Sequence, residues 1–246
     1  MHKQRIKFDF LVHDLKVPLA VIEAGVTALI QKPEKYGPLT DKQLKVLERV
    51  LRNTIITRSL VNDALEIGRS SEGIINKTTF CLADFVRDAL VEVFDLTDHE
   101  MADRVRESTG LRELKRALSK KKVLLEMDES LWNEKVCMDE KKLKQIVRNL
   151  LSNALKYRKE TVELRVGKKG GSLVLTVKDD GEGIPADFHE KIFECYFQMD
   201  MQEDYCVRGH GLGLAGVMVL VEDMGGKLIL ESDVGKGATF SVMLPE

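Results

Sequence analysis

The chain has 246 residues, of which 43% are hydrophobic and 32% charged, and its formal net charge is -2. This length allows one large domain or two ordinary ones, each with a hydrophobic core. The charge balance disfavours nucleic acid as a partner, because the basic excess typical of nucleic-acid binding is missing. No apolar run approaches the roughly 18–20 residues that span a bilayer, and no signal peptide is expected. The cysteines lack metal-ligand spacing, so reduced thiols in a cytoplasmic setting are expected.

Residues 3–30 are predicted to form one long helix. Apolar residues recur along it every three or four positions and form a heptad-like stripe of Leu11, Leu15, Leu19, Ile22, Val26 and Leu29. After a loop over residues 31–39, a second helix is expected to start at Thr40, which can cap it, and to extend to about Gly68. Two such long helices cannot bury their apolar stripes against each other alone. A homodimer that forms a four-helix bundle is therefore expected.

The first helix contains two residues that could take part in chemistry. His13 and Asp14 lie one turn before Pro18, which should kink the helix and free the carbonyl group of Asp14. A surface histidine without a function is the ordinary interpretation of a lone His13. The adjacent Asp14, however, is a candidate base that could orient or deprotonate the imidazole.

The pattern changes from helical to alternating near residues 68–73, which predicts a domain boundary between residues 1–70 and 71–246. Mixed strands and helices in the second part indicate an α/β fold. In chain order, we expect a strand at 74–80, a helix at 82–95, a polar helical stretch through 117, strands at 123–127 and 135–138, a helix at 139–157, a hairpin of 162–166 and 173–178, a helix at 214–224, and strands at 227–231 and 238–244.

The helix predicted at 139–157 has a polar stripe. Asn149, Asn153 and either Lys156 or Tyr157 fall on one face, at positions i, i+4 and i+7 or i+8. Taken alone, a solvated helix face is the commoner interpretation. Carboxamide oxygens can ligate Mg²⁺ and an ammonium group can meet anionic oxygens, so this stripe also suits a metal ion with a string of phosphates.

Two glycine-rich segments follow. DDGEGIP puts Asp179 at the end of a strand, where Gly181 and Gly183 could bring the backbone close to a flat ligand while the carboxylate meets an amino group. Taken alone, this segment is a weak signal, because any Asp-Gly pair can form a simple turn; the second segment is weak alone as well. RGHGLGLAGV precedes a helix whose free N–H groups and positive end favour an anion, and its glycines are Gly209, Gly211 and Gly213.

Taken together, the motifs HDLKVPL, NLLSNALKY, DDGEGIP, KIFECYF and GHGLGLA resemble, in this order, the H, N, G1, F and G2 boxes of bacterial sensor histidine kinases. The resemblance covers nearly the whole chain. It implies an α + α/β architecture, with a dimerising helical hairpin followed by an α/β-sandwich ATP-binding domain of the Bergerat type. Residues 1–70 would be the dimerisation and histidine phosphotransfer domain, and residues 71–246 the catalytic ATP-binding domain.

The reaction implied by the resemblance is phosphoryl transfer from ATP to an imidazole nitrogen of His13, with Asp14 as its base. The phosphoryl group would then pass to an aspartate of a response regulator in two-component signal transduction. The implied cofactors are ATP and Mg²⁺, and the implied partners are a second copy of the chain and a receiver domain in the cytoplasm. This chain has no membrane segment, although a sensor placed before it could be membrane-bound.

The other family roles transfer by position. Asn153 matches the Mg²⁺ ligand, and Asn149 lies on the same face towards metal and phosphates. Asp179 matches the adenine-binding aspartate, and Met199–Arg208 would form a mobile lid. Phe193 and Phe197 are expected to be core and lid-docking aromatics. The implied nucleotide-binding set is Asn149, Asn153, Lys156, Tyr157, Asp179, Gly181, Gly183, Gly209, Gly211 and Gly213.

Three departures from the family pattern stand out. Val17 occupies a position where Thr or Asn usually positions water for dephosphorylation of the regulator, so weak or absent phosphatase activity is expected. Gln198 occupies a position that often carries a basic residue near the γ-phosphate; slow transfer is expected, with Arg208 as the candidate substitute. The charged stretch 97–117 resembles an insert, and a solvated surface helix is its expected form, with a regulatory surface as the alternative.

Other classes of function stay open at this point. An ATP-binding scaffold would bind nucleotide without phosphorylating His13, which Gln198 favours and the intact His13–Asp14 pair disfavours. A chaperone- or repair-type Bergerat ATPase is disfavoured, because such an enzyme has no use for the helical hairpin. A regulator-binding module without catalysis is disfavoured as well, because it would leave the glycine-rich segments unexplained. Regulator specificity is expected at 21–29 and 43–51. The stimulus, the regulator and transfer within or between chains are not determined by the sequence.

Overall fold

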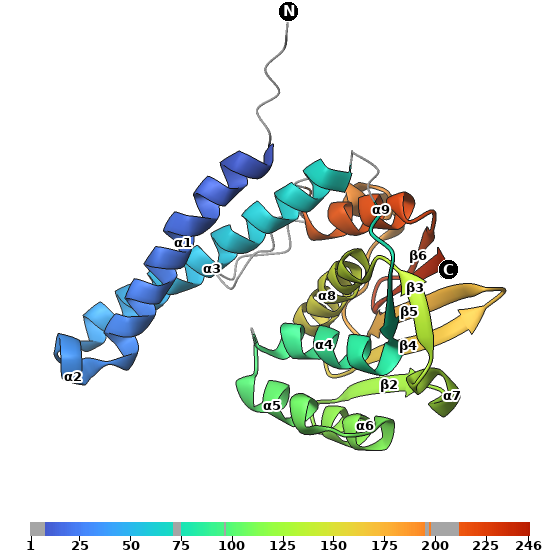
Figure 1. Cartoon of the computed structure of the whole chain (residues 1–246), viewed down its shortest axis with the longest axis horizontal. Coiled ribbons are helices and arrows are strands. Elements are labelled where there is room, and N and C mark those ends of the chain that lie inside the picture. The colour runs from blue at the N-terminus through green and yellow to red at the C-terminus, as the bar shows by residue number, and fades with distance from the viewer. Residues whose placement is uncertain (1–7, 71–74, 96, 195–196, 198–211) are drawn as a thin grey trace, which may run out of the picture. The chain divides into compact units, whose positions relative to one another are not determined.

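The computed structural model describes residues 8–70, 75–95, 97–194, 197 and 212–246. The contacts divide the chain into two units, Met1–Glu72 and Gly73–Glu246. The first is helical and the second combines a sheet with helices (Figure 1). The roles predicted for residues 1–70 and 71–246 stay predictions. None of the helices in the described ranges combines the length and apolar content that a membrane crossing requires.

The first unit is a helical hairpin. Helices α1 (Phe8–Gln31) and α3 (Asp41–Ser70) pack along each other, and the short α2 (Pro33–Tyr36) lies between them in the chain (Figure 1). Thr40 and Gln43 form a capping box at the start of α3. The Gln43 N–H donates to Thr40 Oγ1 at 3.3 Å, and the Thr40 N–H donates to Gln43 Oε1 at 2.9 Å. The predicted cap is therefore confirmed.

The second unit is a sandwich of a five-stranded sheet and a layer of helices. The strand order is β2-β4-β5-β7-β6, in which β2 is parallel to β4 and the other pairs are antiparallel. Buried and more exposed residues alternate along the strands, so one face of the sheet forms the core. The strands are β2 (Val123–Met127), β4 (Val162–Lys169), β5 (Ser172–Asp179), β6 (Lys227–Ser232) and β7 (Ala238–Pro245).

Helices α4 (Leu82–Asp95), α8 (Glu140–Tyr157) and α9 (Gly213–Asp223) share one hydrophobic cluster with the sheet (Figure 1). At the start of α8, the buried Asp139 carboxylate accepts hydrogen bonds from the N–H groups of Lys142 at 3.1 Å and Asn76 at 2.9 Å. The capping bond fixes the first turn of this helix. The unit also contains a two-stranded sheet of β1 (Thr78–Cys81) and β3 (Lys135–Met138) and the short helices α7 (Glu129–Trp132), η1 (Ala186–Phe188) and η2 (Lys191–Phe193).

The expectation of a solvated surface helix over residues 97–117 is wrong. This stretch forms α5 (His99–Glu107) and α6 (Leu111–Ser119), which pack against α4 and β2 respectively. Their apolar residues recur every three or four positions and face inward, while the charges lie on the outer faces. The overall charge of the stretch obscured this spacing. The inner residues, each at most 5% exposed, are Met101, Ala102, Val105, Leu111, Leu114 and Leu118.

The β4–β5 hairpin is longer than predicted. Its turn consists of Gly170 and Gly171, with φ angles of 59° and 79°, in place of a six-residue loop. Two positive φ values in succession match the twist of antiparallel strands, so the ladder continues to the Lys169–Ser172 pair. The second strand of the hairpin, β5, ends at Asp179. This residue therefore lies at a strand end, beside the candidate site.

Candidate functional site

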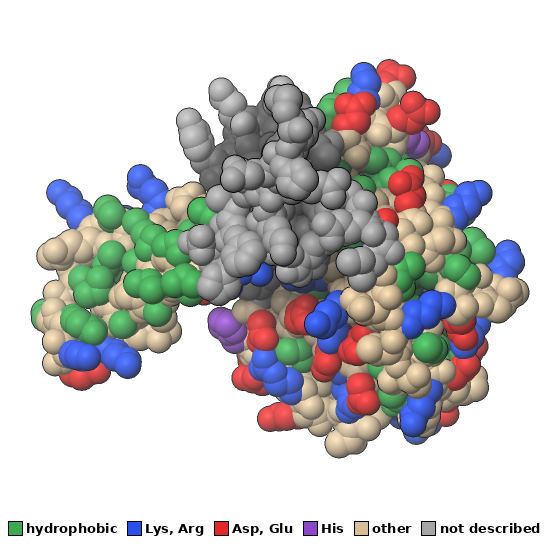
Figure 2. Space-filling model, turned by 45° about the horizontal axis from the view of Figure 1, so that its top comes forward, with side chains coloured by type: hydrophobic (Ala, Val, Ile, Leu, Met, Phe, Trp, Pro, Cys, Tyr) green, Lys and Arg blue, Asp and Glu red, His purple; other side chains and the backbone are tan. Residues whose placement is uncertain are grey.

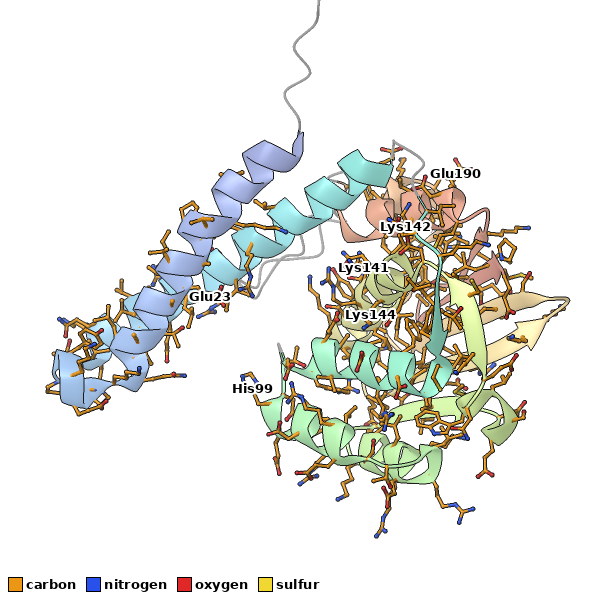
Figure 3. The ribbon with its side chains drawn as sticks, in the orientation of Figure 1. Glu23, His99, Lys141, Lys142, Lys144 and Glu190 are labelled. Atoms are coloured by element: carbon orange, nitrogen blue, oxygen red, sulfur yellow. The ribbon has the colours of Figure 1, made fainter. Side chains whose placement is uncertain are left out.

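Helices α8 and α9 meet along a polar seam. Asn149 Nδ2 donates to the carbonyl oxygen of Gly213 at 3.2 Å. Further along the seam, Lys142 Nζ lies 2.8 Å from Asp223 Oδ2, and each of these side chains is only 15% exposed. Figure 3 labels Lys142 at the start of α8. These contacts bring two predicted site residues, Asn149 and Gly213, together.

The N-terminus of α9 lies beside Asn149. A Cβ atom at Gly213 would be 3.9 Å from Asn149 Cγ, and the preceding residue, Leu212, makes no side-chain capping bond. The first N–H groups of a helix lack intrahelical acceptors and concentrate positive potential, so this end of α9 suits an anion. The predicted Gly209 and Gly211 lie outside the described residues.

The seam also offers oxygen ligands for a cation. Asn149 Nδ2 is bonded to the Gly213 carbonyl, and within the described ranges no group donates to its Oδ1. Asn153 presents a second, partly exposed carboxamide one turn further along α8. Within the described ranges, no group of three or more His, Cys, Asp or Glu residues could hold a metal. A hard cation that keeps waters or phosphate oxygens fits such a sparse set, as Mg²⁺ does.

Asp179 is buried at the end of β5, with 7% of its surface exposed. Its Oδ1 accepts hydrogen bonds from the N–H groups of Gly181 at 2.9 Å and Ala238 at 3.3 Å. Among the described residues, none donates to Oδ2, so this oxygen is available to an amino group of a ligand. Burial raises the pKa of this carboxyl group, and the two N–H donors oppose that rise.

The glycines of the DDGEGIP segment are required by the chain's own packing. A Cβ at Gly181 would lie 2.3 Å from the carbonyl oxygen of Tyr157, and one at Gly183, whose φ is +74°, would lie 1.9 Å from that of Asp233. These distances exclude any side chain. The sequence suggested close approach to a flat ligand, but the structure gives a second reason. The ligand role of both glycines stays a prediction.

Lys156 and Tyr157 end α8 with exposed side chains. Lys156 Nζ lies 3.1 Å from the Tyr157 hydroxyl oxygen and 4.7 Å from the centre of its ring. This pair presents a cation and an aromatic face on the helix end nearest the DDGEGIP segment. Both groups suit contact with a nucleotide.

Several other predicted residues are placed by the structure. Phe193 lies edge-on to Phe240 at 6.4 Å, and Phe197 lies 5.8 Å from Phe188, with both packed on the core, so their core role is confirmed. His13 and Asp14 belong to α1, but their side chains lie outside the described part of the chain. Gln198 and the predicted lid at 199–208 also lie outside it.

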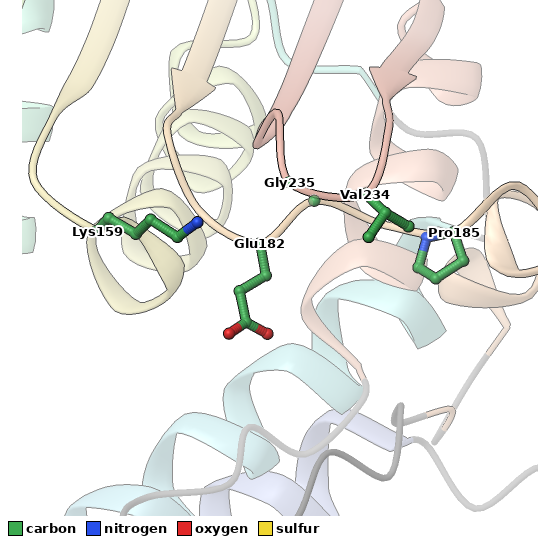
Figure 4. Close-up of a pocket in the computed structure, with 6 residues that line it drawn as sticks. Lys159, Glu182, Pro185, Val234 and Gly235 are labelled. Carbon is green, nitrogen blue, oxygen red and sulfur yellow. The ribbon is translucent and has the colours of Figure 1, made fainter.

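The structure adds two residues that the sequence analysis did not identify. Asp180 accepts hydrogen bonds from the loop after α8, a role that the second Asp of the Asp-Asp-Gly sequence does not by itself indicate. Ser232 Oγ accepts from the Ile184 N–H at 2.8 Å and donates to the Gly237 carbonyl at 2.7 Å. Beside these residues, loops line a pocket of about 190 Å³ that is open to solvent (Figure 4), formed by Lys159, Glu182, Gly183, Pro185, Val234 and Gly235.

Comparisons with known proteins indicate the family that this site resembles. Residues 138–246 match the family described as histidine kinase-, DNA gyrase B-, and HSP90-like ATPase. The chain is 30% identical over 245 residues to the circadian input-output histidine kinase CikA of Synechococcus elongatus, covering 98% of this chain and 30% of that relative. The chain therefore spans less than a third of that relative's length.

Solved structures support the fold. Full-length ShkA, crystallised in complex with AMPPNP, has a TM-score of 0.65 at 23% identity, covering 97% of this chain and 45% of that one. The Acinetobacter baumannii histidine kinase AdeS has a TM-score of 0.57 at 18% identity, covering 95% and 97%. Residues 138–246 thus form an ATPase domain of the histidine kinase, gyrase and HSP90 type. This domain match and the relatives named histidine kinases support a sensor histidine kinase catalytic core for this chain.

Proposed function

We propose that this core is an ATP-dependent protein histidine kinase that phosphorylates itself on His13 and passes the phosphoryl group to an aspartate of a response regulator. The observation that supports this most is the buried Asp179 with its available Oδ2, in a domain where the α8–α9 seam brings Asn149 to the N-terminus of α9. These features suit adenine at one end of a nucleotide and phosphates at the other.

The chain's residues would divide the work as follows. Asp179 Oδ2 accepts a hydrogen bond from the adenine amino group, and Lys156 and Tyr157 meet nucleotide and phosphate. Asn149 and Asn153 would hold Mg²⁺, which would supply charge neutralisation on the triphosphate. Asp14 orients the His13 imidazole and favours its nucleophilic nitrogen. Transfer then depends on positioning more than on covalent catalysis by the protein.

The surface of the hairpin supports the proposal of a homodimer formed through it. Figure 2 shows hydrophobic side chains gathered on the hairpin. In the predicted heptad stripe, Val26 is buried, whereas Leu15 and Ile22 are each 43% exposed in the single chain. A second hairpin would cover these residues in a four-helix bundle.

The partner that receives the phosphoryl group would be a receiver domain in the cytoplasm, where ATP is supplied. Val17, which is 52% exposed on α1, has no polar side-chain atom to position a water. The proposed kinase therefore has weak or no phosphatase activity towards its phosphorylated regulator.

Label transfer from γ-labelled ATP with Mg²⁺ tests the proposal on the wild type, His13→Ala and Asn153→Ala. His99→Ala is a matched control, because His99 is an exposed histidine of α5 (Figure 3). We expect acid-labile, alkali-stable label on the wild type and on His99→Ala, and none on the other two variants. Absence of label on a wild type that still binds nucleotide would replace the kinase with the ATP-binding scaffold, for which Gln198 is the motivating residue.

A further inference from the structure

The Asp180 carboxylate accepts a dense set of hydrogen bonds from one short loop. Its Oδ1 accepts from the backbone N–H groups of Lys159, Glu160 and Thr161 at 2.9, 3.0 and 3.0 Å. Its Oδ2 accepts from the N–H groups of Glu160 and Thr161 and from Thr161 Oγ1, the last at 2.9 Å. Three successive N–H groups around one carboxylate form an anion-binding concavity that the chain fills with its own side chain.

This loop follows α8 directly and leads into β4. Its backbone therefore determines how the end of α8 lies over the DDGEGIP segment. The close approach of the Tyr157 carbonyl oxygen to Gly181 shows how little space separates the two segments. Asp179, one residue before Asp180, pairs in register with Val162, one residue after the loop. Asp180 thus connects the start of β4, the end of β5 and the end of α8. These three ends meet beside Asp179, the residue proposed to bind adenine.

The fixed loop also forms one wall of the pocket in Figure 4. Lys159 extends from this loop towards Glu182 of the DDGEGIP segment, and Val234 and Gly235 lie opposite. On its other side, the Glu182 carbonyl accepts from the Gly235 N–H at 2.6 Å. The segment that presents Asp179 is therefore held from two directions, by the loop through Asp180 and by the β6–β7 turn.

We propose that Asp180 is a positioning residue for nucleotide binding, which fixes the loop after α8 against the DDGEGIP segment and so holds Asp179 and Tyr157 in register with one another. This rests on the proposed function, since Asp179 is taken as the adenine ligand. Asp180 itself points its carboxylate at the chain's own backbone, and it acts on the nucleotide through its neighbours.

The test is autophosphorylation by the whole chain, with KM for ATP and kcat measured separately, together with calorimetric Kd values for Mg·ADP. Asp180→Ala is expected to raise KM and Kd roughly tenfold and to leave kcat at saturating ATP within about twofold, as for loss of a supporting residue. Asp180→Asn keeps one acceptor oxygen but turns an NH2 group towards N–H donors of the loop, so it should recover only part of the affinity. Asp128→Ala is the matched control, because Asp128 is exposed and makes no capping bond at α7.

A double variant separates positioning from general stability. If Asp180 acts through Asp179, Asp179→Asn with Asp180→Ala should bind within about twofold of Asp179→Asn alone. Should Asp180→Ala not fold, Thr161→Val removes only the hydroxyl donor and should still raise KM about twofold or more.

Four results would overturn the proposal. A lower kcat with unchanged KM would show loss of folded protein only, and multiplied losses in the double variant would show independent action. Equal affinities of wild type and Asp180→Ala would leave the proposed kinase function intact and reject the positioning role. A wild type that binds no nucleotide would reject both.

Discussion

Asp179 is a residue whose charge opposes folding. Burial raises the pKa of its carboxyl group in the folded chain. The stability that this group can contribute is therefore fully present below its unfolded value of 3.8, where it is protonated, and is lost as pH rises through the raised folded value. At pH 7 the protein holds a buried carboxylate with one unpartnered oxygen among the described residues, which is a cost that a ligand amino group would offset.

Asp179→Asn should separate stability from binding. The amide keeps an acceptor for the N–H groups of Gly181 and Ala238 but removes the buried charge, so Tm at pH 7 should rise by a few degrees. Nucleotide affinity should fall about 10- to 100-fold, because a hydrogen bond to a charged group contributes about 1.5–3 kcal/mol. Thermal unfolding and calorimetric titration with Mg·ADP measure the two effects. Asp187→Asn, at an exposed position, is the control. A fall in Tm would contradict this account of the charge.

Asp180 has the opposite linkage. Burial alone would raise the pKa of its carboxyl group, but the backbone N–H groups of Glu160, Thr161 and Lys159 and the Thr161 hydroxyl lower it to about 2. Its stabilising effect is therefore present above the unfolded value of 3.8 and is lost as pH falls towards about 2.

The pH dependence of unfolding tests this linkage. The stability difference between wild type and Asp180→Ala should be largest at pH 6, about 1–3 kcal/mol, and should shrink between pH 4 and 2. Urea unfolding at several pH values in this range measures the difference. A difference that stays constant down to pH 2 would show that the charged form of Asp180 is not what the loop binds.

Among the elements, the α8–α9 pair determines the geometry of the proposed phosphate end. The Lys142–Asp223 ion pair lies at one end of the seam and the Asn149–Gly213 hydrogen bond at the other. Because the Lys142 and Asp223 side chains are only 15% exposed, removing one leaves the other poorly solvated.

Lys142→Ala is expected to lower the free energy of unfolding by about 1–3 kcal/mol and to weaken nucleotide binding, because α9 shifts relative to Asn149. The neighbouring Lys141, exposed on the same helix (Figure 3), gives a matched control in Lys141→Ala. Urea unfolding and Mg·ADP titration of both variants provide the measurement. Equal stability of the two would mean that the ion pair does not support the seam.

Helices α5 and α6 belong to the core of the second unit, despite their charge. Leu114→Ala should destabilise the protein by about 2–5 kcal/mol, because Leu114 is fully buried and its truncation leaves a cavity. Arg112, with a side chain 93% exposed, should tolerate alanine with a change within about 0.5 kcal/mol. Chemical unfolding of both variants is the measurement. Similar values for the two would restore the solvated-helix interpretation.

Elements with strong periodicity could be predicted from the sequence. The bounds of α4 and β2 match the prediction, because their apolar patterns have a clear period and end at turn residues. The parallel pairing of β2 with β4 could not be predicted, since it depends on contacts between distant segments. The buried face of α5 and α6 is hard to predict, because the many charged residues obscure apolar residues that recur every three or four positions.

The same limit applies to the site. The position of Asp179 at a strand end followed from a local pattern, and the structure places it there. The hydrogen bonds of Asp180 join residues 19 to 21 positions apart in the chain, and the bond between Ser232 and Ile184 joins residues 48 apart, so no local pattern contains that information. Gly181 and Gly183 were identified by residue type, but their packing against Tyr157 and Asp233 depends on the assembled loops.

At the scale of the whole molecule, the two units differ in how far their described apolar residues are buried. The second unit has its own hydrophobic cluster, which includes residues from both the sheet and the helices. Among the described side chains of the hairpin, the buried apolar one is Val26, while Leu15, Val17, Val21 and Ile22 of α1 are all at least 43% exposed. With so little apolar surface buried among the hairpin side chains that the structure describes, the hairpin is expected to depend on a second copy for its stability.

Ile22→Glu should therefore convert the proposed dimer into a monomer, because it would place a charge in the apolar seam of the four-helix bundle. Light scattering coupled to size-exclusion chromatography measures the mass. Ala24→Glu is the matched control, because Ala24 is exposed and lies away from the stripe of Leu15 and Ile22. Mg·ADP affinity should be unchanged in both variants, since all the proposed nucleotide contacts belong to the second unit. A dimer that survives Ile22→Glu would exclude this stripe as the interface and redirect the search to Val17 and Val21.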